Sequence, residues 1–179
     1  MAVVRAMVRQ VRGSVLNAYL GFINLKWGRA ALKQCLDDLK ITAEFKSGEY
    51  YDEGYRISLL KWISQEKGMD YNAELGRHVV KNLGLLAWIV RFANPKILAK
   101  KFPENYKEVY NFGRIEVDIK EGNTIHLRLY DVNSIKESCL SWHGVCEGAL
   151  EITKKSGVVT KTMCQLEGHD CCEYKIDYD

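Results

Sequence analysis

The sequence has few prolines and no long apolar run, and both absences narrow the class of protein. Only two of its 179 residues are proline and no tract is of low complexity, which argues against a disordered chain. No run approaches the roughly 18 apolar residues that a membrane-spanning helix needs. Residues 1–12 mix three arginines into their apolar residues and lack the continuous core of a secretory signal. We therefore expect a cytoplasmic protein without a membrane span.

Several catalytic motifs are also absent. The sequence contains no phosphate-binding loop, no dinucleotide-binding fingerprint and no serine-nucleophile elbow. It has no Cys-x-x-Cys-His haem-attachment motif, and no pair of carboxylates stands out. The net charge of +3 is too small to indicate that the protein binds nucleic acid directly. These absences favour a binding module over an enzyme.

The composition that remains is that of one folded domain. Hydrophobic residues make up 47% of the chain and charged residues 27%, which is ordinary for a globular protein. A chain of this length buries roughly 70% of its unfolded surface, so its stability does not depend on cross-links. We expect an N-terminal arm over residues 1–12 and a single ligand-binding domain over residues 13–179.

The first part of this domain, residues 13–110, has the periodicity of helices. Longer helices are expected over residues 14–25, 29–39, 52–65 and 73–93, and short ones over 96–101 and from Pro103 to about residue 110. Gly28 separates the first two helices, and Asp52 can cap the third. Asn94 and Pro95 end the fourth, because a residue before proline avoids the helical region.

The second part, residues 111–179, has the alternation of β-strands. Ile115, Val117 and Ile119 alternate with charged residues, and a second run follows after Gly122, which predicts a hairpin. A capping box at Ser134–Glu137 opens a helix to about residue 153, and a second hairpin covers residues 158–178. The order β-β-α-β-β predicts one four-stranded antiparallel sheet. The fold class is therefore α+β, with a helical half before the sheet.

Cysteines gather in the second part, where five of the six follow residue 138. A hairpin loop at residues 167–169 would place Cys164 opposite Cys172 on one face of the sheet, with Cβ atoms roughly 4.5–5.5 Å apart. Cys139, in the first turn of the preceding helix, is the natural third thiol. Three interpretations stay open on geometry alone: a metal site, buried inert thiols, or a disulfide, which a reducing cytoplasm disfavours.

Aromatic residues suggest an apolar pocket between the two halves. Trp62, His78 and Trp88 are the candidate ligand-binding residues, and Trp142 is another aromatic side chain that could line the pocket. At helical spacing such residues also suit an ordinary core. A single histidine such as His78 suffices to ligate haem.

The last hairpin and its preceding helix resemble the 4-vinyl-reductase domain family. The motif is Cys164-x-x-x-Gly168-x-x-x-Cys172, followed by Glu-Tyr-Lys-Ile, with Cys139 and Gly-Val-Cys146-Glu-Gly upstream. The start of the domain, with Trp27 and Gly28 after one helix, is similar to haem-nitric-oxide-binding domains. Both families share this fold with TRAPP vesicle-tethering subunits, and the resemblance implies a homodimer and a small apolar, aromatic or tetrapyrrole ligand.

The resemblance also implies a metal site. In aromatic-sensing relatives zinc is held by one cysteine of the helix, one glutamate and two cysteines of the last hairpin, and Cys139, Cys164 and Cys172 match the three thiols. The glutamate position is occupied by Lys161, so a fourth ligand would come from Cys171, His169, His143, Cys146 or water. The Tyr-x-Ser-x-Arg signature of the haem-binding relatives is missing. We therefore expect zinc in preference to haem or another tetrapyrrole.

These observations favour a small-molecule sensor or regulatory domain with an apolar pocket and a cysteine cluster. Two alternatives remain. One is a vinyl-reductase or accessory protein that acts on tetrapyrroles in chlorophyll-type biosynthesis, although no hydride-handling motif is present. The other is a dimeric interaction scaffold without a small ligand.

Overall fold

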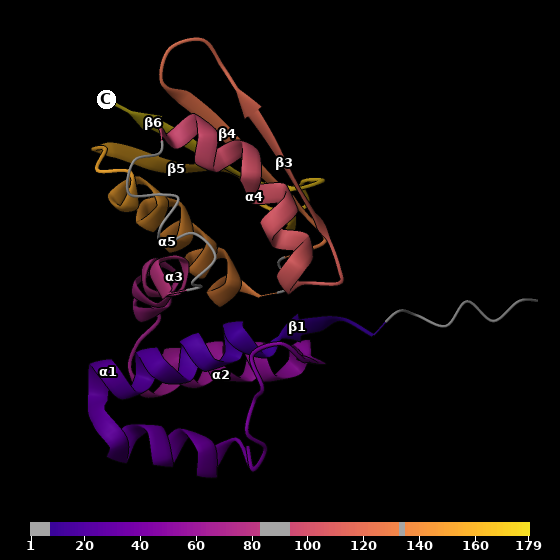
Figure 1. Ribbon diagram of the computed structural model, residues 1–179, viewed down its shortest axis with the longest axis vertical. Coiled ribbons are helices and arrows are strands. Elements are labelled where there is room, and N and C mark those ends of the chain that lie inside the picture. The colour runs from indigo at the N-terminus through magenta and orange to yellow at the C-terminus, as the bar shows by residue number, and fades with distance from the viewer. Residues whose placement is uncertain (1–7, 83–93, 133–134) are drawn as a thin grey trace, which may run out of the picture.

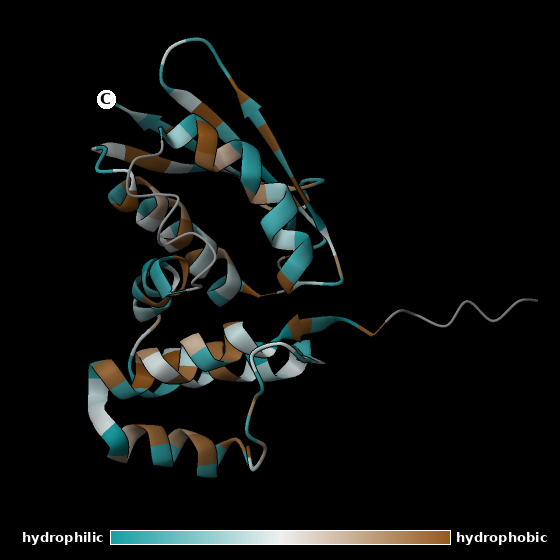
Figure 2. Cartoon of the chain, in the orientation of Figure 1, coloured by the Kyte–Doolittle hydropathy of each residue, from teal (hydrophilic) through white to brown (hydrophobic). Residues whose placement is uncertain are grey.

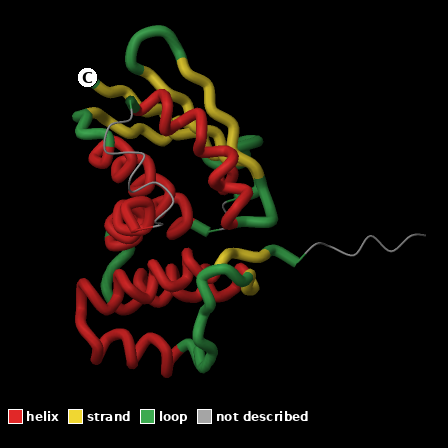
Figure 3. The backbone as a smooth tube through the Cα atoms, in the orientation of Figure 1, coloured by secondary structure: helices red, strands yellow, loops and turns green. Residues whose placement is uncertain are grey.

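The computed structural model describes residues 8–82, 94–132 and 135–179. Helices α1 (Gly13–Asp38) and α2 (Glu53–Glu66) form one layer, and α3 (Tyr71–Asn82) lies between this layer and the sheet half (Figure 1). Two short strands, β1 (Gln10–Arg12) and β2 (Tyr50–Asp52), pair antiparallel beside the start of α1. Strands otherwise gather at the opposite end of the molecule, as Figure 3 shows.

Helix α1 contains the two helices that the sequence predicts. Its backbone leaves the helical region at Gly28, whose φ of 82° is open to glycine at little cost, and the second half folds back along the first. Buried residues of the first half recur at helical spacing: Val15, Leu16, Tyr19, Phe22 and Ile23. In α2, the Asp52 side chain accepts a hydrogen bond from the Gly54 amide at 2.7 Å, which confirms the predicted cap.

Helix α4 (Pro95–Val109) replaces the two short helices that we expected. Asn94 caps it by accepting from the Lys96 amide at 2.9 Å, and Pro95 occupies the first turn, where no amide hydrogen is needed. Pro103 lies inside the helix and does not end it. The buried residues on either side, Leu98 and Tyr106, continue one apolar face, so packing outweighs the lost hydrogen bond. The predicted helix over 73–93 is described only as far as Asn82.

The sheet confirms the predicted α+β architecture. Strands β3 (Arg114–Ile119), β4 (Thr124–Tyr130), β5 (Gly157–Met163) and β6 (Cys172–Tyr178) form an antiparallel sheet in the order β3-β4-β6-β5. Helix α5 (Lys136–Ile152) connects the two hairpins, and α4 and α5 cover the same sheet face. Hydrophobic and hydrophilic residues alternate along these elements (Figure 2), which buries one face of each. Ser134 of the predicted capping box lies outside the described residues.

Helices α3 and α5 pack unusually closely because glycines meet at their crossing. A Cβ atom on Gly76 would lie 1.9 Å from the Ser141 carbonyl oxygen, and one on Gly144 would lie 1.9 Å from the Ala73 carbonyl oxygen. Gly144 therefore lets α5 lie directly against helix α3. This contact joins the helical half to the sheet half. In the described parts of the chain, no helix is long and apolar enough to cross a membrane.

Candidate functional site

A cavity of about 70 Å³ lies where helices α3, α4 and α5 meet. It is lined by residues of all five helices. Its apolar wall consists of Val79, Val80, Phe102, Val109, Trp142 and Val145. Trp142 is thus one predicted pocket aromatic that does line a cavity. A wall of this kind suits an apolar or aromatic ligand.

Arg56 closes one side of this cavity although it is only 1% exposed. Its Nε donates to Glu53 Oε1 at 2.9 Å, and its Nη2 donates to the same oxygen and to Ser138 Oγ at 3.3 Å. Burial opposes the charge, but the neighbouring Tyr19 and Glu53 groups outweigh it and raise the pKa of Arg56. A neutralised ion pair therefore borders an otherwise apolar space.

Asn105 offers the cavity an unused hydrogen-bond donor. Its Nδ2 atom is buried and has no partner among the residues that the structure describes. Buried donors in folded proteins are nearly always paired, so this atom needs an explanation. A ligand that carries an acceptor would supply the missing partner.

Three tyrosines also line the cavity. The rings of Tyr106 and Tyr110 stack with centroids 4.7 Å apart, and the Tyr106 hydroxyl donates to the Phe112 carbonyl at 2.6 Å. Tyr19 lines the cavity as well, from α1. Burial raises the pKa of Tyr106 and Tyr110, so these phenols are protonated at neutral pH.

A second, smaller cavity of about 40 Å³ lies between α4, α5 and the sheet. Its wall includes Leu98, Phe102, Ile125, Leu127, Cys146 and Ile176. Phe102 lines both cavities, so rotation of its ring would change the volume of each.

Of the three predicted ligand-binding residues, the two that the structure describes do not line the cavities. Trp62 is buried in α2, where its Nε1 donates to Asp38 at 2.9 Å. His78 lies on α3 with its ring 5.5 Å from that of Phe22, and burial lowers its pKa. Neither is among the described residues that line the two cavities. Trp88 lies outside the described residues, and a ligand role for these three stays a prediction.

The three predicted thiols do come together. The Sγ atoms of Cys139, Cys164 and Cys172 lie within 4.8 Å of one another, and all three side chains are buried. Their role as metal ligands stays a prediction. The Tyr174 hydroxyl donates to the Cys139 carbonyl at 2.7 Å, which fixes the start of α5 over the sheet. Among the described residues, the cluster contains no histidine or carboxylate.

Lys161 belongs to this cluster because β5 contains a bulge. Met163 pairs with Glu173, as the predicted register requires, but the register shifts by one residue so that Lys161 pairs with Tyr174. The shift turns Lys161 to the inner face, where its Nζ lies 2.7 Å from Cys164 Sγ. Burial opposes the ammonium charge, but hydrogen bonds to Cys139 and Cys164 outweigh it and raise the pKa of Lys161.

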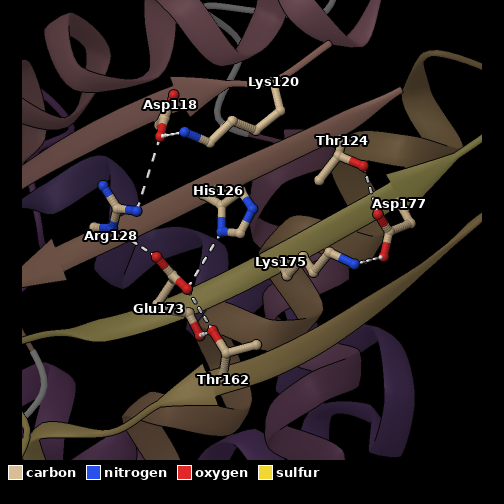
Figure 4. Close-up of polar contacts among 9 residues, drawn as sticks. All are labelled: Asp118, Lys120, Thr124, His126, Arg128, Thr162, Glu173, Lys175 and Asp177. Atoms are coloured by element: carbon tan, nitrogen blue, oxygen red, sulfur yellow. Dashed lines mark hydrogen bonds and ion pairs between the residues drawn. The ribbon is translucent and has the colours of Figure 1, made fainter. Parts of the chain in front are cut away.

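The outer face of the sheet carries a separate polar network (Figure 4). At its centre Glu173 is 6% exposed and accepts hydrogen bonds from Arg128 Nε at 2.6 Å and Thr162 Oγ1 at 2.7 Å. His126 Nδ1 lies 3.3 Å from the same carboxylate. The His126 side chain is only 19% exposed. The network joins three strands and has the partners of a structural ion cluster.

The polar residues of the cavity were not predicted from the sequence. Arg56 precedes Leu59, Leu60 and Ile63 at helical spacing, so a charged residue on an apolar face was the available signal. Asn105 gave no such signal, because it lies in a polar stretch of α4.

Comparison with known proteins shows the fold. The sequence matches no protein-family model and no curated protein. Among solved structures it is similar to an H-NOX protein from S. oneidensis in the Fe(II)NO ligation state, with a TM-score of 0.78, 17% identity, and coverage of 94% of this chain and 99% of that one. An H-NOX domain from Shewanella oneidensis in the Fe(II)CO state is similar with a TM-score of 0.75 and 18% identity, and the match covers 94% of this chain and 98% of that one. An oxygen-binding H-NOX domain related to soluble guanylate cyclases, in its oxygen complex, is similar with a TM-score of 0.75 and 11% identity. That match covers 94% of this chain and 95% of the other.

This comparison corrects the cofactor prediction. We expected zinc in preference to haem, on the strength of the cysteine cluster and the missing Tyr-x-Ser-x-Arg signature. Among the solved structures that share the fold over 94% of this chain, one is an Fe(II)NO form, one is an Fe(II)CO form and one is an oxygen complex. The ranking was wrong because a local motif was given more weight than the whole fold.

Proposed function

We propose that this chain is a small-molecule sensor domain whose ligand lies in the cavity between α3, α4 and α5. The observation that carries the proposal is the buried Asn105 Nδ2, a donor that has no partner in the described part of the chain and belongs to a residue of a largely apolar cavity lining. Ligand sites typically combine apolar walls with a few polar groups that fix orientation. The cavity also lies where the helical half meets the sheet half, so its contents bear on how the two halves pack.

Haem is the first candidate ligand. The solved structures with this fold support it, and haem supplies a gas-binding iron when it is bound. No histidine is among the described residues that line the cavity. Binding of the haem iron would therefore depend on Tyr19 or Tyr110, because tyrosine is an established haem ligand. The cavity of about 70 Å³ would have to widen by movement of α4 from α5.

A small aromatic molecule without haem is the second candidate, and the size of the cavity favours it. An apolar cavity of roughly 150 Å³ holds benzene. The two cavities that Phe102 lines have volumes of about 70 Å³ and 40 Å³, so a single ring needs much less rearrangement than a porphyrin. Asn105 would then donate to a hydroxyl or carbonyl oxygen of the ligand.

Titration of the purified chain with haemin separates these candidates. We expect a saturable Soret band with one haem per chain, and a shifted or lost band in Tyr110→Phe or Tyr19→Phe. If no Soret band forms, single-ring phenols and ketones should raise the melting temperature. Asn105→Leu should reduce that rise, while the exposed Asn123→Ala should not. Absence of both responses would overturn the proposal.

Two finer expectations stay proposals. The spacing of Cys164, Gly168 and Cys172 supports a relation to 4-vinyl-reductase domains, and the implied homodimer depends on the same resemblance. Light scattering with size-exclusion chromatography would measure the oligomeric state, and a monomer at high concentration would remove the dimer from consideration.

A further inference from the structure

The thiol cluster is separate from the ligand cavity and has its own chemistry. Its three sulfurs come from the first turn of α5, the residue after β5, and the first residue of β6. Cys139 is 6% exposed, Cys164 is 4% exposed and Cys172 is 0% exposed. No residue of the cluster lines either cavity in the described chain. Three buried thiols from three segments of the chain therefore form a binding site that suits a soft, sulfur-preferring ion or element.

The position where a fourth ligand would stand is taken by a positive charge. Lys161 Nζ lies 2.7 Å from Cys164 Sγ. His169 is held at the main chain of Cys164, with its Nδ1 3.1 Å from the carbonyl oxygen, and it is not part of the cluster. A protonated lysine cannot coordinate a cation and repels one. A divalent metal that requires four ligands is therefore poorly served here.

We propose that Cys139, Cys164 and Cys172 bind a neutral three-coordinate thiophile of the trivalent arsenic class. Trivalent arsenic forms three bonds to sulfur in a pyramid and needs no fourth ligand. Arsenous acid condenses with three thiols: three As–O bonds break, three As–S bonds form, and each hydroxide leaves with one thiol proton as water. No electrons are transferred and no oxidant is required.

Coordination number separates this ligand class from a divalent metal cation. The arsenic tris-thiolate is complete with three sulfurs and has no net charge. Lys161 keeps its proton and stays next to sulfur atoms that can still accept weak hydrogen bonds. A divalent cation with three thiolates would still lack a fourth ligand, because a protonated amine cannot coordinate it.

The geometry needs only side-chain adjustment. Bonds to sulfur of about 2.3 Å would place the three sulfurs within about 4 Å of one another. The Sγ atoms already lie within 4.8 Å. The turn Gln165–Glu167 lies beside the cluster, since the Gln165 amide donates to Cys172 Sγ at 3.3 Å, and it contains no buried residue.

Sodium arsenite added to the reduced full chain tests the proposal by intact mass spectrometry under native conditions. We expect one arsenic per chain, with a mass gain of one arsenic atom less three protons. Three of the six thiols should at the same time lose reactivity toward maleimide after brief unfolding. Cys139→Ser, Cys164→Ser and Cys172→Ser should each weaken binding at least tenfold, while Cys35→Ser, on α1, should leave it unchanged.

Two results would overturn the proposal. One is an adduct that has lost only two protons, because it would contain two thiols. The other is equal binding by wild type and Cys172→Ser. Circular dichroism of each variant checks its fold. If Cys172→Ser does not fold, protection of Cys139 and Cys164 from alkylation by arsenite in the wild-type chain decides, and lack of protection refutes the site.

Discussion

The Nζ atom of Lys161 lies 2.7 Å from the Sγ atom of Cys164, inside a cluster of three buried thiols. The contact exists because a bulge shifts the register of β5 between Lys161 and Met163. Without that shift Lys161 would pair with Lys175 and face the outer side of the sheet. The bulge therefore supplies the cluster with its own cation.

Replacement of this lysine by an acid should change the ion that the cluster takes. Lys161→Glu provides three thiols and one carboxylate, a four-ligand set that suits Zn²⁺. We expect the variant to bind Zn²⁺ at least tenfold more tightly than wild type, measured by competition with a chromogenic chelator. Lys175→Glu, on the outer face of the same sheet half, is the matched control and should bind as wild type does. Equal affinity of Lys161→Glu and wild type would show that the ammonium does not decide the ion.

Loss of the buried arginine should strongly destabilise the chain. Arg56→Met leaves Glu53 as an unpaired carboxylate in the interior, which typically costs about 3–5 kcal/mol of unfolding free energy. Urea denaturation should show a lower midpoint with an unchanged slope. The double variant with Glu53→Met should recover most of the loss, because both charges are then removed. Lys46→Met, which removes an exposed pair with Glu49, should not measurably change the midpoint. A double variant as unstable as the single one would contradict this account.

The glycine crossing of α3 and α5 should not tolerate a methyl group. In Gly144→Ala the new Cβ would lie 1.9 Å from the Ala73 carbonyl oxygen, and backbone cannot easily yield. Overpacking of this kind costs about 1–3 kcal/mol or more. Gly21→Ala is the control, since nothing lies within 4 Å of its Cβ position and alanine favours the helix by up to about 1 kcal/mol. The two alanine variants should therefore shift the urea midpoint in opposite directions, and a shift of the same sign would be inconsistent with the close crossing.

The layout of the chain could be predicted because its signals are local. Gly28 marks the break in α1, Asp52 caps α2, and alternation in the strands gives the sheet. Pro103 misled the prediction of α4, because tertiary packing of Leu98 and Tyr106 outweighs a missing amide hydrogen.

The site was less accessible to sequence reasoning. The thiol cluster was predictable, since hairpin register brings Cys164 near Cys172. The inward turn of Lys161 was not, because a bulge has no signature in this strand. The cavity depends on the meeting of five helices, so Asn105 and Arg56 could be assigned to it only from the structure.

Acid should destabilise the fold through the outer face of the sheet. Burial opposes ionisation of Glu173, but hydrogen bonds from Thr162 and Arg128 outweigh it and lower the pKa of Glu173 below its ordinary value of 4.5. A carboxylate with a lowered pKa in the folded state stabilises the fold above pH 4.5, and this stabilisation is lost as the pH falls through the folded-state pKa. The urea midpoint, measured from pH 7 down to acid, should therefore decrease once the pH is below 4.5.

In Glu173→Gln the chain should be less stable at neutral pH, because the charged hydrogen bonds to Arg128 are gone. Its midpoint should also fall less steeply in acid, because one carboxylate that must be protonated has been removed. Parallel pH profiles for the two chains would show that this ion cluster does not contribute to the acid dependence.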